Sequence, residues 1–334
     1  MWLKFRGENV KSVIQRIFQS NNMKKLTIGF IGNFIPPYST ENDRAWSFEK
    51  LGHRVIRFQE NKTRAIDLYN AMSGLDLLIY SHTHDPSYII ADLIAVFQRY
   101  KTEGIPTISV HLDRWLGLAR VKDMGTEATW FTEYIFMADG SPEAVKLYKD
   151  LNLNWFWLKP GVIERDCYIA SADPIRFPHE IVFVGSRGYH PEYPFRPQLV
   201  DWLKSTYGDR FGHYGSDGLG TVRGHDLNTL YASAKVVVGD SCFGGRPYYW
   251  SDRVTETMGR GGVLIHPWCE GMGDLPLTTY EPNNLESIKQ NIQFYLDNPE
   301  FREGYRIRAS EYVKENETYT ARAFEMLNII FKDK

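Results

Sequence analysis

The sequence has few cysteines, no long apolar run and no strong net charge, and each shortage excludes a class of protein. The three cysteines, Cys167, Cys242 and Cys269, lie far apart, which argues against a disulfide framework and a zinc site. No apolar run approaches the roughly 20 residues that cross a bilayer, and the N-terminus lacks a signal peptide's apolar core. With 39 Lys and Arg against 41 Asp and Glu, no overall basic field attracts nucleic acid. We expect a cytoplasmic protein with no integral membrane segment.

Three nucleotide and hydrolase motifs are also missing. Gly29 and Gly32 lack the Gly-x-Gly-x-x-Gly spacing of a dinucleotide-binding turn, and the chain has no Gly-x-x-x-x-Gly-Lys phosphate loop. The run 239–244 does not satisfy the Gly-x-Ser-x-Gly hydrolase pattern. These absences disfavour dinucleotide-dependent oxidoreductases, P-loop enzymes and serine hydrolases.

Short β-branched runs alternate with helical segments in two successive series. This pattern predicts an α/β protein with two doubly wound, Rossmann-like domains facing a cleft. The first series has expected strands at 26–33, 53–59, 75–82, 105–113, 134–139 and 155–158, with helices at 45–51, 63–72, 87–102 and 142–151. The second has expected strands at 180–185, 210–214, 235–240 and 263–266, with helices at 197–206, 227–233 and 253–260, and further helices from Asn284 onward.

These patterns divide the 334 residues into four segments. We expect an N-terminal helical extension (1–22), a first domain (23–160), a second domain (161–315) and a C-terminal helix (316–334). Residues 2–18 form a basic amphipathic pattern, which would either contact a membrane surface or pack on its own domain.

Titratable side chains follow two neighbouring strands of the first series. His82 and His84 follow the third expected strand, and His111 and Asp113 end the fourth. Because ligands bind beyond the carboxyl ends of parallel strands, these four residues are candidates for acid–base catalysis. A metal site and a purely structural role for these residues are the alternatives.

Small and polar residues likewise follow the strands of the second series. Backbone near small residues can approach a phosphate closely, and arginine can neutralise a leaving diphosphate without a metal. The candidates are Gly185, Ser186, Arg187, Arg196, Tyr214, Gly215, Ser216 and Asp240.

The most informative stretch is 251–262, which reads as a cap, a short helix, a glycine stop and then an apolar strand. Ser251 and Asp252 are ordinary N-cap residues, and Arg253 and Glu256 lie in the first turn, where they would either bind phosphate and ribose or only offset the helix dipole. The spacing of Arg253, Glu256 and Gly261 resembles the Arg-x-x-Glu-x-x-x-x-Gly pattern of group-1 glycosyltransferases with the GT-B fold. The segments 182–186 and 231–236 support this resemblance, which is best to the compact branch related to spore-maturation proteins and phage-encoded enzymes.

The resemblance implies a glycosyltransferase that moves a sugar from a nucleotide-sugar, with a UDP-sugar as the default, to an acceptor hydroxyl. It implies that Glu256 holds the donor ribose, that Arg253 and Ser251 lie near the phosphates, and that the last helix crosses back onto an acceptor-side first domain. The chain has no Asp-x-Asp metal triplet, so we expect neither a metal nor a cofactor. Many retaining members carry a second Glu where this chain has Tyr248, so the stereochemical outcome is not transferred.

The acceptor and the reaction class leave alternatives open. The acceptor would be a glycan, a protein, a small molecule or modified DNA. DNA would need a basic face, for which the first domain offers Lys24, Lys25, Arg44, Arg54, Arg57, Lys62 and Arg64. The competing hypotheses are a non-catalytic two-lobed sugar- or nucleotide-binding protein and a UDP-sugar epimerase.

Overall fold

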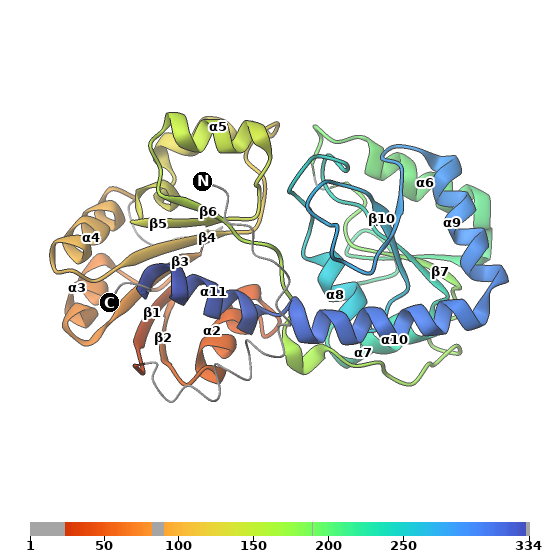
Figure 1. Cartoon of the computed structure of the whole chain (residues 1–334), viewed down its shortest axis with the longest axis horizontal. Helices are drawn as coiled ribbons and strands as arrows, with labels where there is room; N and C mark the ends of the chain where they lie inside the picture. Colours follow the sequence, from red (N-terminus) through yellow and green to blue (C-terminus); the bar gives the residue numbers. More distant parts are fainter. Residues whose placement is uncertain (1–23, 82–89, 189, 332–334) are drawn as a thin grey trace.

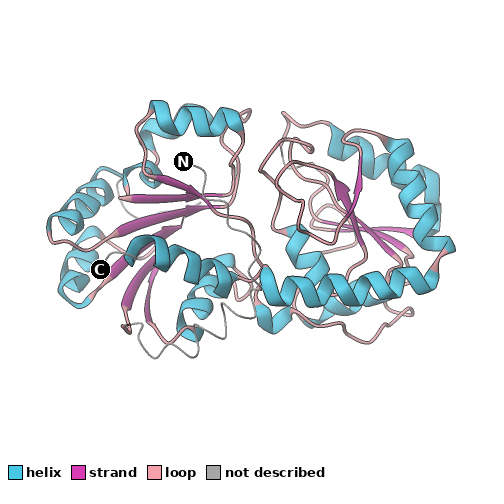
Figure 2. Cartoon of the chain, in the orientation of Figure 1, coloured by secondary structure: helices cyan, strands magenta, loops and turns pink. Residues whose placement is uncertain are grey.

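The structure is a computed structural model that describes residues 24–81, 90–188 and 190–331. The expected extension 1–22 and the candidates His82 and His84 lie outside these residues. Two sheets, each flanked by helices, lie side by side (Figures 1 and 2). Every strand pair in both sheets is parallel, with the orders β2-β1-β3-β4-β5-β6 and β11-β10-β9-β7-β8. The predicted α/β fold with two Rossmann-like sheets is confirmed.

The first sheet is formed by β1 (Thr27–Gly32), β2 (Arg54–Gln59), β3 (Leu77–Ser81), β4 (Thr107–His111), β5 (Tyr134–Met137) and β6 (Trp155–Trp157). Its connections include α2 (Thr40–Lys50), α3 (Ala65–Ala71), α4 (Ile90–Thr102) and α5 (Pro142–Asp150). The strands β3 and β4 are buried at every position, as expected for a parallel sheet covered on both faces. Helix α2 begins where the hydroxyl of Ser39 accepts a hydrogen bond from the Asn42 amide at 3.1 Å.

The second sheet is formed by β7 (Ile181–Val184), β8 (Phe211–Tyr214), β9 (Val236–Val238), β10 (Leu264–Pro267) and β11 (Thr278–Tyr280). The helices of the second half are α6 (Phe195–Tyr207), α7 (His225–Ser233), α8 (Arg253–Gly259), α9 (Leu285–Asp297), α10 (Pro299–Asn316) and α11 (Tyr319–Phe331). This sheet has its own core, in which β9 is buried at all three positions.

The last two helices connect the two halves of the molecule. Helix α10 packs along α8 in the second domain, whereas α11 packs against α2 in the first (Figure 1). Met326 and Leu327 of α11 belong to the same buried cluster as Ile28 and Phe30 of β1. The expected return of the C-terminal helix to the first domain is therefore observed. None of the helices in the described part of the chain combines the length and apolar character that a membrane span needs.

Three of the differences between the structure and the sequence-based expectation have a clear physical reason or affect whole elements. Helix α2 begins at Thr40 instead of residue 45, because Ser39 caps it. Two 3₁₀ helices, Ala119–Thr126 and Ala128–Phe131, occupy a segment for which no element was expected. The edge strand β11 was not expected either, because its three residues become a strand only by pairing with β10.

Candidate functional site

A cavity of about 270 Å³ lies between the two sheets, beyond the carboxyl ends of β7 and β8. Its second-domain wall comes from the turns after these strands, from the loop before α7 and from the start of α8. The first domain closes the cavity with Tyr38, Thr40 and Asp43, and the connector between the sheets adds Asp166. The cavity thus occupies the position at which parallel α/β sheets bind their ligands.

The turn after β7 and the start of α8 form one unit. Gly185 has a φ of +138°, which favours glycine. A Cβ at this position would lie 2.7 Å from Cζ of Arg253, so the guanidinium lies directly over the turn. The amide of Ser251 donates to the Ser241 hydroxyl at 2.9 Å, and the Ser251 hydroxyl accepts from the Arg253 amide at 3.3 Å. These contacts fix the backbone from which Arg253 and Glu256 reach the cavity.

Arg253 and Glu256 are half-buried charged residues in the cavity wall. Within the described residues, no hydrogen bond or ion pair engages either side chain. Burial, and then the nearby Arg196, lower the pKa of Arg253; burial, and then Asp252, raise the pKa of Glu256. Since unpaired charges are costly to bury, this pair is suited to a polar ligand that offers hydroxyl donors to the carboxylate and anionic oxygens to the guanidinium.

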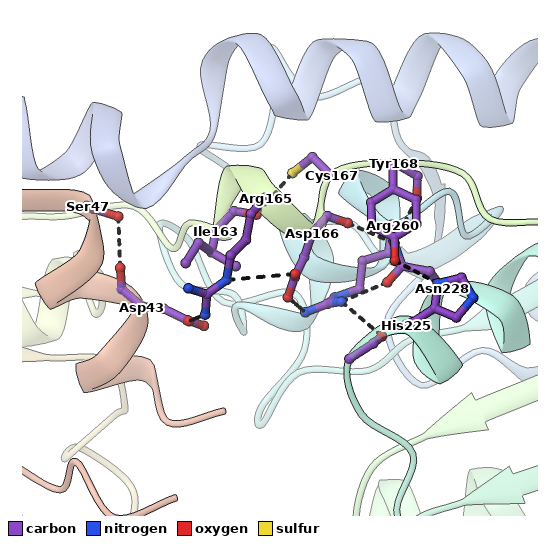
Figure 3. A network of polar contacts seen from close by, with 11 residues as sticks. Asp43, Ser47, Ile163, Arg165, Asp166, Cys167, Tyr168, His225, Asn228 and Arg260 are labelled. Carbon is purple, nitrogen blue, oxygen red and sulfur yellow. Dashed lines mark hydrogen bonds and ion pairs between the residues drawn. The ribbon is translucent and has the colours of Figure 1, made fainter. Parts of the chain in front are cut away.

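A network of ion pairs and hydrogen bonds forms another part of the cavity wall (Figure 3). Arg165 of the connector donates to Oδ1 of Asp43 at 2.7 Å. Arg260, the C-cap residue of α8, lies 2.5 Å from Oδ2 of Asp166 and donates to Oδ1 of Asn228 at 2.7 Å. The network therefore links α2 of the first domain, through the connector, to α8 and α7 of the second.

The structure brings together most of the predicted donor-binding residues. Those that line the cavity are Gly185, Ser186, Tyr214, Gly215, Ser216, Asp252, Arg253 and Glu256. Ser251 lies behind them and holds the start of α8.

Three other predicted donor-binding residues are engaged elsewhere. Arg187 pairs with Asp201 on an exposed surface. Arg196 and Asp240 form a buried ion pair, with Nε to Oδ2 at 3.0 Å, and the Tyr193 hydroxyl donates to Oδ1 of Asp240 at 2.9 Å. None of the three lines the cavity, so we assign them structural roles.

The described acid–base candidates of the first domain lie outside the cavity wall. His111 is buried, its Nε2 accepts from the Trp115 indole at 3.0 Å, and its Nδ1 lies 2.9 Å from the Asp113 carbonyl oxygen. Both ring nitrogens are thus engaged, which removes His111 as a free base. Asp113 is half-buried, and its charge adds to the effect of burial in raising the pKa of Tyr249 of the second domain.

Sequence reasoning missed Asp43, Asp166 and Arg260. Arg260 belongs to the singled-out stretch 251–262, and Asp43 follows the first strand within the polar run 39–43; both positions were local signals. Asp166, in the connector, offered none. Within the described residues, no group of three or more His, Cys, Asp or Glu side chains is placed to hold a metal ion.

Comparison with known proteins places this geometry in context. Residues 196–328 match a family described as glycosyl transferase-like. No curated protein sequence matches the chain.

Several solved structures are similar to the chain at low identity. Sucrose-phosphate synthase from Thermosynechococcus elongatus superposes with a TM-score of 0.61 at 11% identity, over 92% of this chain and 99% of that chain. Anabaena HepE in complex with UDP-glucose superposes with a TM-score of 0.62 at 12% identity, over 92% of this chain and 100% of that chain. T4 phage BGT in complex with its UDP-glucose substrate superposes with a TM-score of 0.55 at 11% identity, over 92% of this chain and 99% of that chain. The predicted GT-B fold and the predicted resemblance to glycosyltransferases of this fold are confirmed.

Proposed function

We propose that this protein, which has the GT-B fold and matches a glycosyl transferase-like family over residues 196–328, moves a sugar from a UDP-sugar to an acceptor hydroxyl without a metal ion. The observation that carries the proposal is the pair Arg253 and Glu256, whose side chains have no partner among the described residues and face one cavity beside the Gly185 turn. HepE and T4 phage BGT have this fold and were solved with UDP-glucose, which supports uracil as the base.

Each side chain has a distinct role in this proposal. Glu256 accepts hydrogen bonds from the ribose hydroxyls, while Arg253 and the backbone of the Gly185 turn hold the diphosphate. As the bond between the sugar and the diphosphate breaks, negative charge grows on the leaving group. A guanidinium already in place stabilises that charge without reorganisation, so no metal is needed for this purpose.

The acceptor enters from the first domain in this proposal. Asp113 remains the candidate base for the acceptor hydroxyl among the described residues, because it follows the end of β4 and its charge acts on Tyr249 of the second domain. DNA is a poor match as acceptor: of the basic residues that would attract it, Arg44 is buried, and Lys24, Arg57 and Arg64 each pair with a carboxylate. Cys167 and Cys269 are buried and form no disulfide among the described residues, which fits the cytoplasmic location that we include in the proposal.

The test is UDP binding by titration calorimetry, followed by assays of UDP release from a panel of UDP-sugars. Glu256→Gln should weaken UDP binding about 10- to 100-fold, because it removes a charged acceptor of hydrogen bonds. Glu325→Gln is the control: it removes a carboxylate in the same way, but Glu325 lies on α11, outside the cavity.

Each other outcome points to a different conclusion. Unchanged UDP affinity in Glu256→Gln would show that the ribose assignment is wrong. Tight UDP binding without turnover of any UDP-sugar would favour the non-catalytic binding protein. Conversion of one UDP-sugar into an isomer would identify an epimerase.

A further inference from the structure

The cavity contains more acidic than basic side chains, although the proposed ligand is an anion. Four carboxyl groups line it, against three guanidinium groups. The carboxyl groups belong to Asp43, Asp166, Asp252 and Glu256, and the guanidinium groups to Arg223, Arg253 and Arg260. If all were ionised, the wall would be net negative before a diphosphate entered. An anion that enters this wall raises the free-energy cost of each ionised carboxyl group in it, so ligand binding favours protonation of one of them.

Asp43 is the carboxyl group whose geometry suits this change. It is 9% exposed and comes from the first domain, opposite Glu256. Its Oδ1 accepts the hydrogen bond from Arg165. Its Oδ2 has no hydrogen-bond partner among the described residues and can carry a proton without breaking an existing contact. By contrast, both oxygens of Asp166 lie near arginines, with Oδ2 bound to Arg260.

We propose that binding of a nucleoside diphosphate in this cavity is coupled to the uptake of one proton from solvent by Asp43. The protonated carboxyl group then donates a hydrogen bond from Oδ2 to the ligand, while Oδ1 keeps its bond from Arg165. This inference rests on the proposed function, because it takes the diphosphate of the donor as the ligand.

The groups around Asp43 agree with this assignment. Burial raises its pKa to about 7; the neighbouring carboxylates of Asp166 and Glu256 add to the rise, and Arg165 and Arg260 oppose it. From α11, Tyr319 also faces Asp43, but burial raises its pKa well above the usual value, so it stays neutral. On α2 itself, the Arg44 guanidinium is buried over the Tyr319 ring. Adding an anion raises the pKa of a nearby carboxyl group further, which favours proton uptake near neutral pH.

The first domain is held in place for this role independently of the charge on Asp43. Lys50 of α2 lies 3.3 Å from the Glu164 carboxylate of the connector. Lys50 and Arg165 both lie over the Trp46 ring, at 5.1 and 5.6 Å from its centroid. These contacts keep α2 against the connector, and asparagine at position 43 would still accept the bond from Arg165. Asp43→Asn should therefore fold and mimic the protonated state.

The experiment is titration calorimetry of the full chain with UDP, in two buffers of different ionisation enthalpy, from about pH 6 to about pH 8.5. The wild type should take up close to one proton above about pH 7, and its UDP affinity should fall toward tenfold per pH unit there. Asp43→Asn should lack this uptake and bind UDP more tightly than the wild type at the highest pH. Any titration of UDP itself is common to both proteins and cancels in the comparison.

Asp252→Asn is the second variant, because Asp252 also lines the cavity. It should keep the uptake that Asp43→Asn loses. Uptake that persists in Asp43→Asn, or equal heats for the wild type in both buffers, would overturn the inference while the proposed function stands. Failure of the wild type to bind UDP at any pH would overturn both.

Discussion

The buried ion pair between Arg196 and Asp240 gives the sharpest test of which arginines stabilise the fold and which bind the UDP-sugar. The side chain of Arg196 is 7% exposed and that of Asp240 is 0% exposed. The Arg196 Nε lies 3.0 Å from Oδ2, and the Tyr193 hydroxyl donates to Oδ1. Removing the guanidinium leaves Asp240 with one neutral donor in a buried site.

The expected cost follows from that geometry. Breaking a buried ion pair by removing one partner costs about 3–5 kcal/mol of unfolding free energy, because the remaining charge is uncompensated. Burial already raises the pKa of Asp240, and Arg196 opposes this rise. In Arg196→Met the pKa rises further above its unfolded value, so the lost stability should grow as the pH increases from about 5 to about 8. In the double variant Arg196→Met, Asp240→Asn, no buried charge remains, and most of the loss should be recovered.

Urea denaturation, followed by tryptophan fluorescence, measures these unfolding free energies. Titration calorimetry measures UDP affinity in buffer without urea, at a pH at which each variant is folded. Arg196→Met should show a large loss of unfolding free energy. Its UDP affinity should stay within about threefold of that of the wild type, since Arg196 does not line the cavity. A stability change below about 1 kcal/mol together with a tenfold or greater loss of UDP affinity would refute this prediction, and would return Arg196 to the donor site.

Three further predictions concern single positions. Gly185→Ala should lower the free energy of unfolding by about 1–3 kcal/mol and weaken UDP binding, because its Cβ would lie 2.7 Å from Cζ of Arg253 at a φ of +138°. Urea denaturation measures the first effect and titration calorimetry the second. Leu327→Ala should lower the unfolding free energy by about 2–5 kcal/mol, because Leu327 is 1% exposed in the first-domain core. Burial raises the thiol pKa of Cys167 and Cys269 to about 12, so iodoacetamide should label them only after unfolding, as mass spectrometry would show.

The order of strands and helices could be predicted because most elements carry a local signal. Strands β3 and β4 are apolar runs buried on both faces, and α9 and α11 have apolar residues spaced for one helical face. Strand β11 and the 3₁₀ helices of 119–131 carry no such signal. Their structure depends on partners distant in the sequence or on packing against the first sheet.

The candidate site likewise contains residues with a local sequence signal and residues without one. Gly185, Arg253 and Glu256 could be predicted because strand ends and a short motif mark them locally. Asp166 could not, because it reaches the cavity only through the relative position of the two domains, and Asp43 offered only its place in the polar run after the first strand. Arg196 and Asp240 show the reverse error: Arg196 lies in the first turn of α6 and Asp240 follows β9, but the two pair with each other across 44 residues.

The position of UDP in crystals of the protein grown with this nucleotide tests the central claim most directly. The account predicts the ribose hydroxyls within hydrogen-bonding distance of the Glu256 carboxylate, and the diphosphate against the Arg253 guanidinium and the Gly185 turn. UDP bound elsewhere, or in this cavity with its ribose turned away from Glu256, would contradict the account.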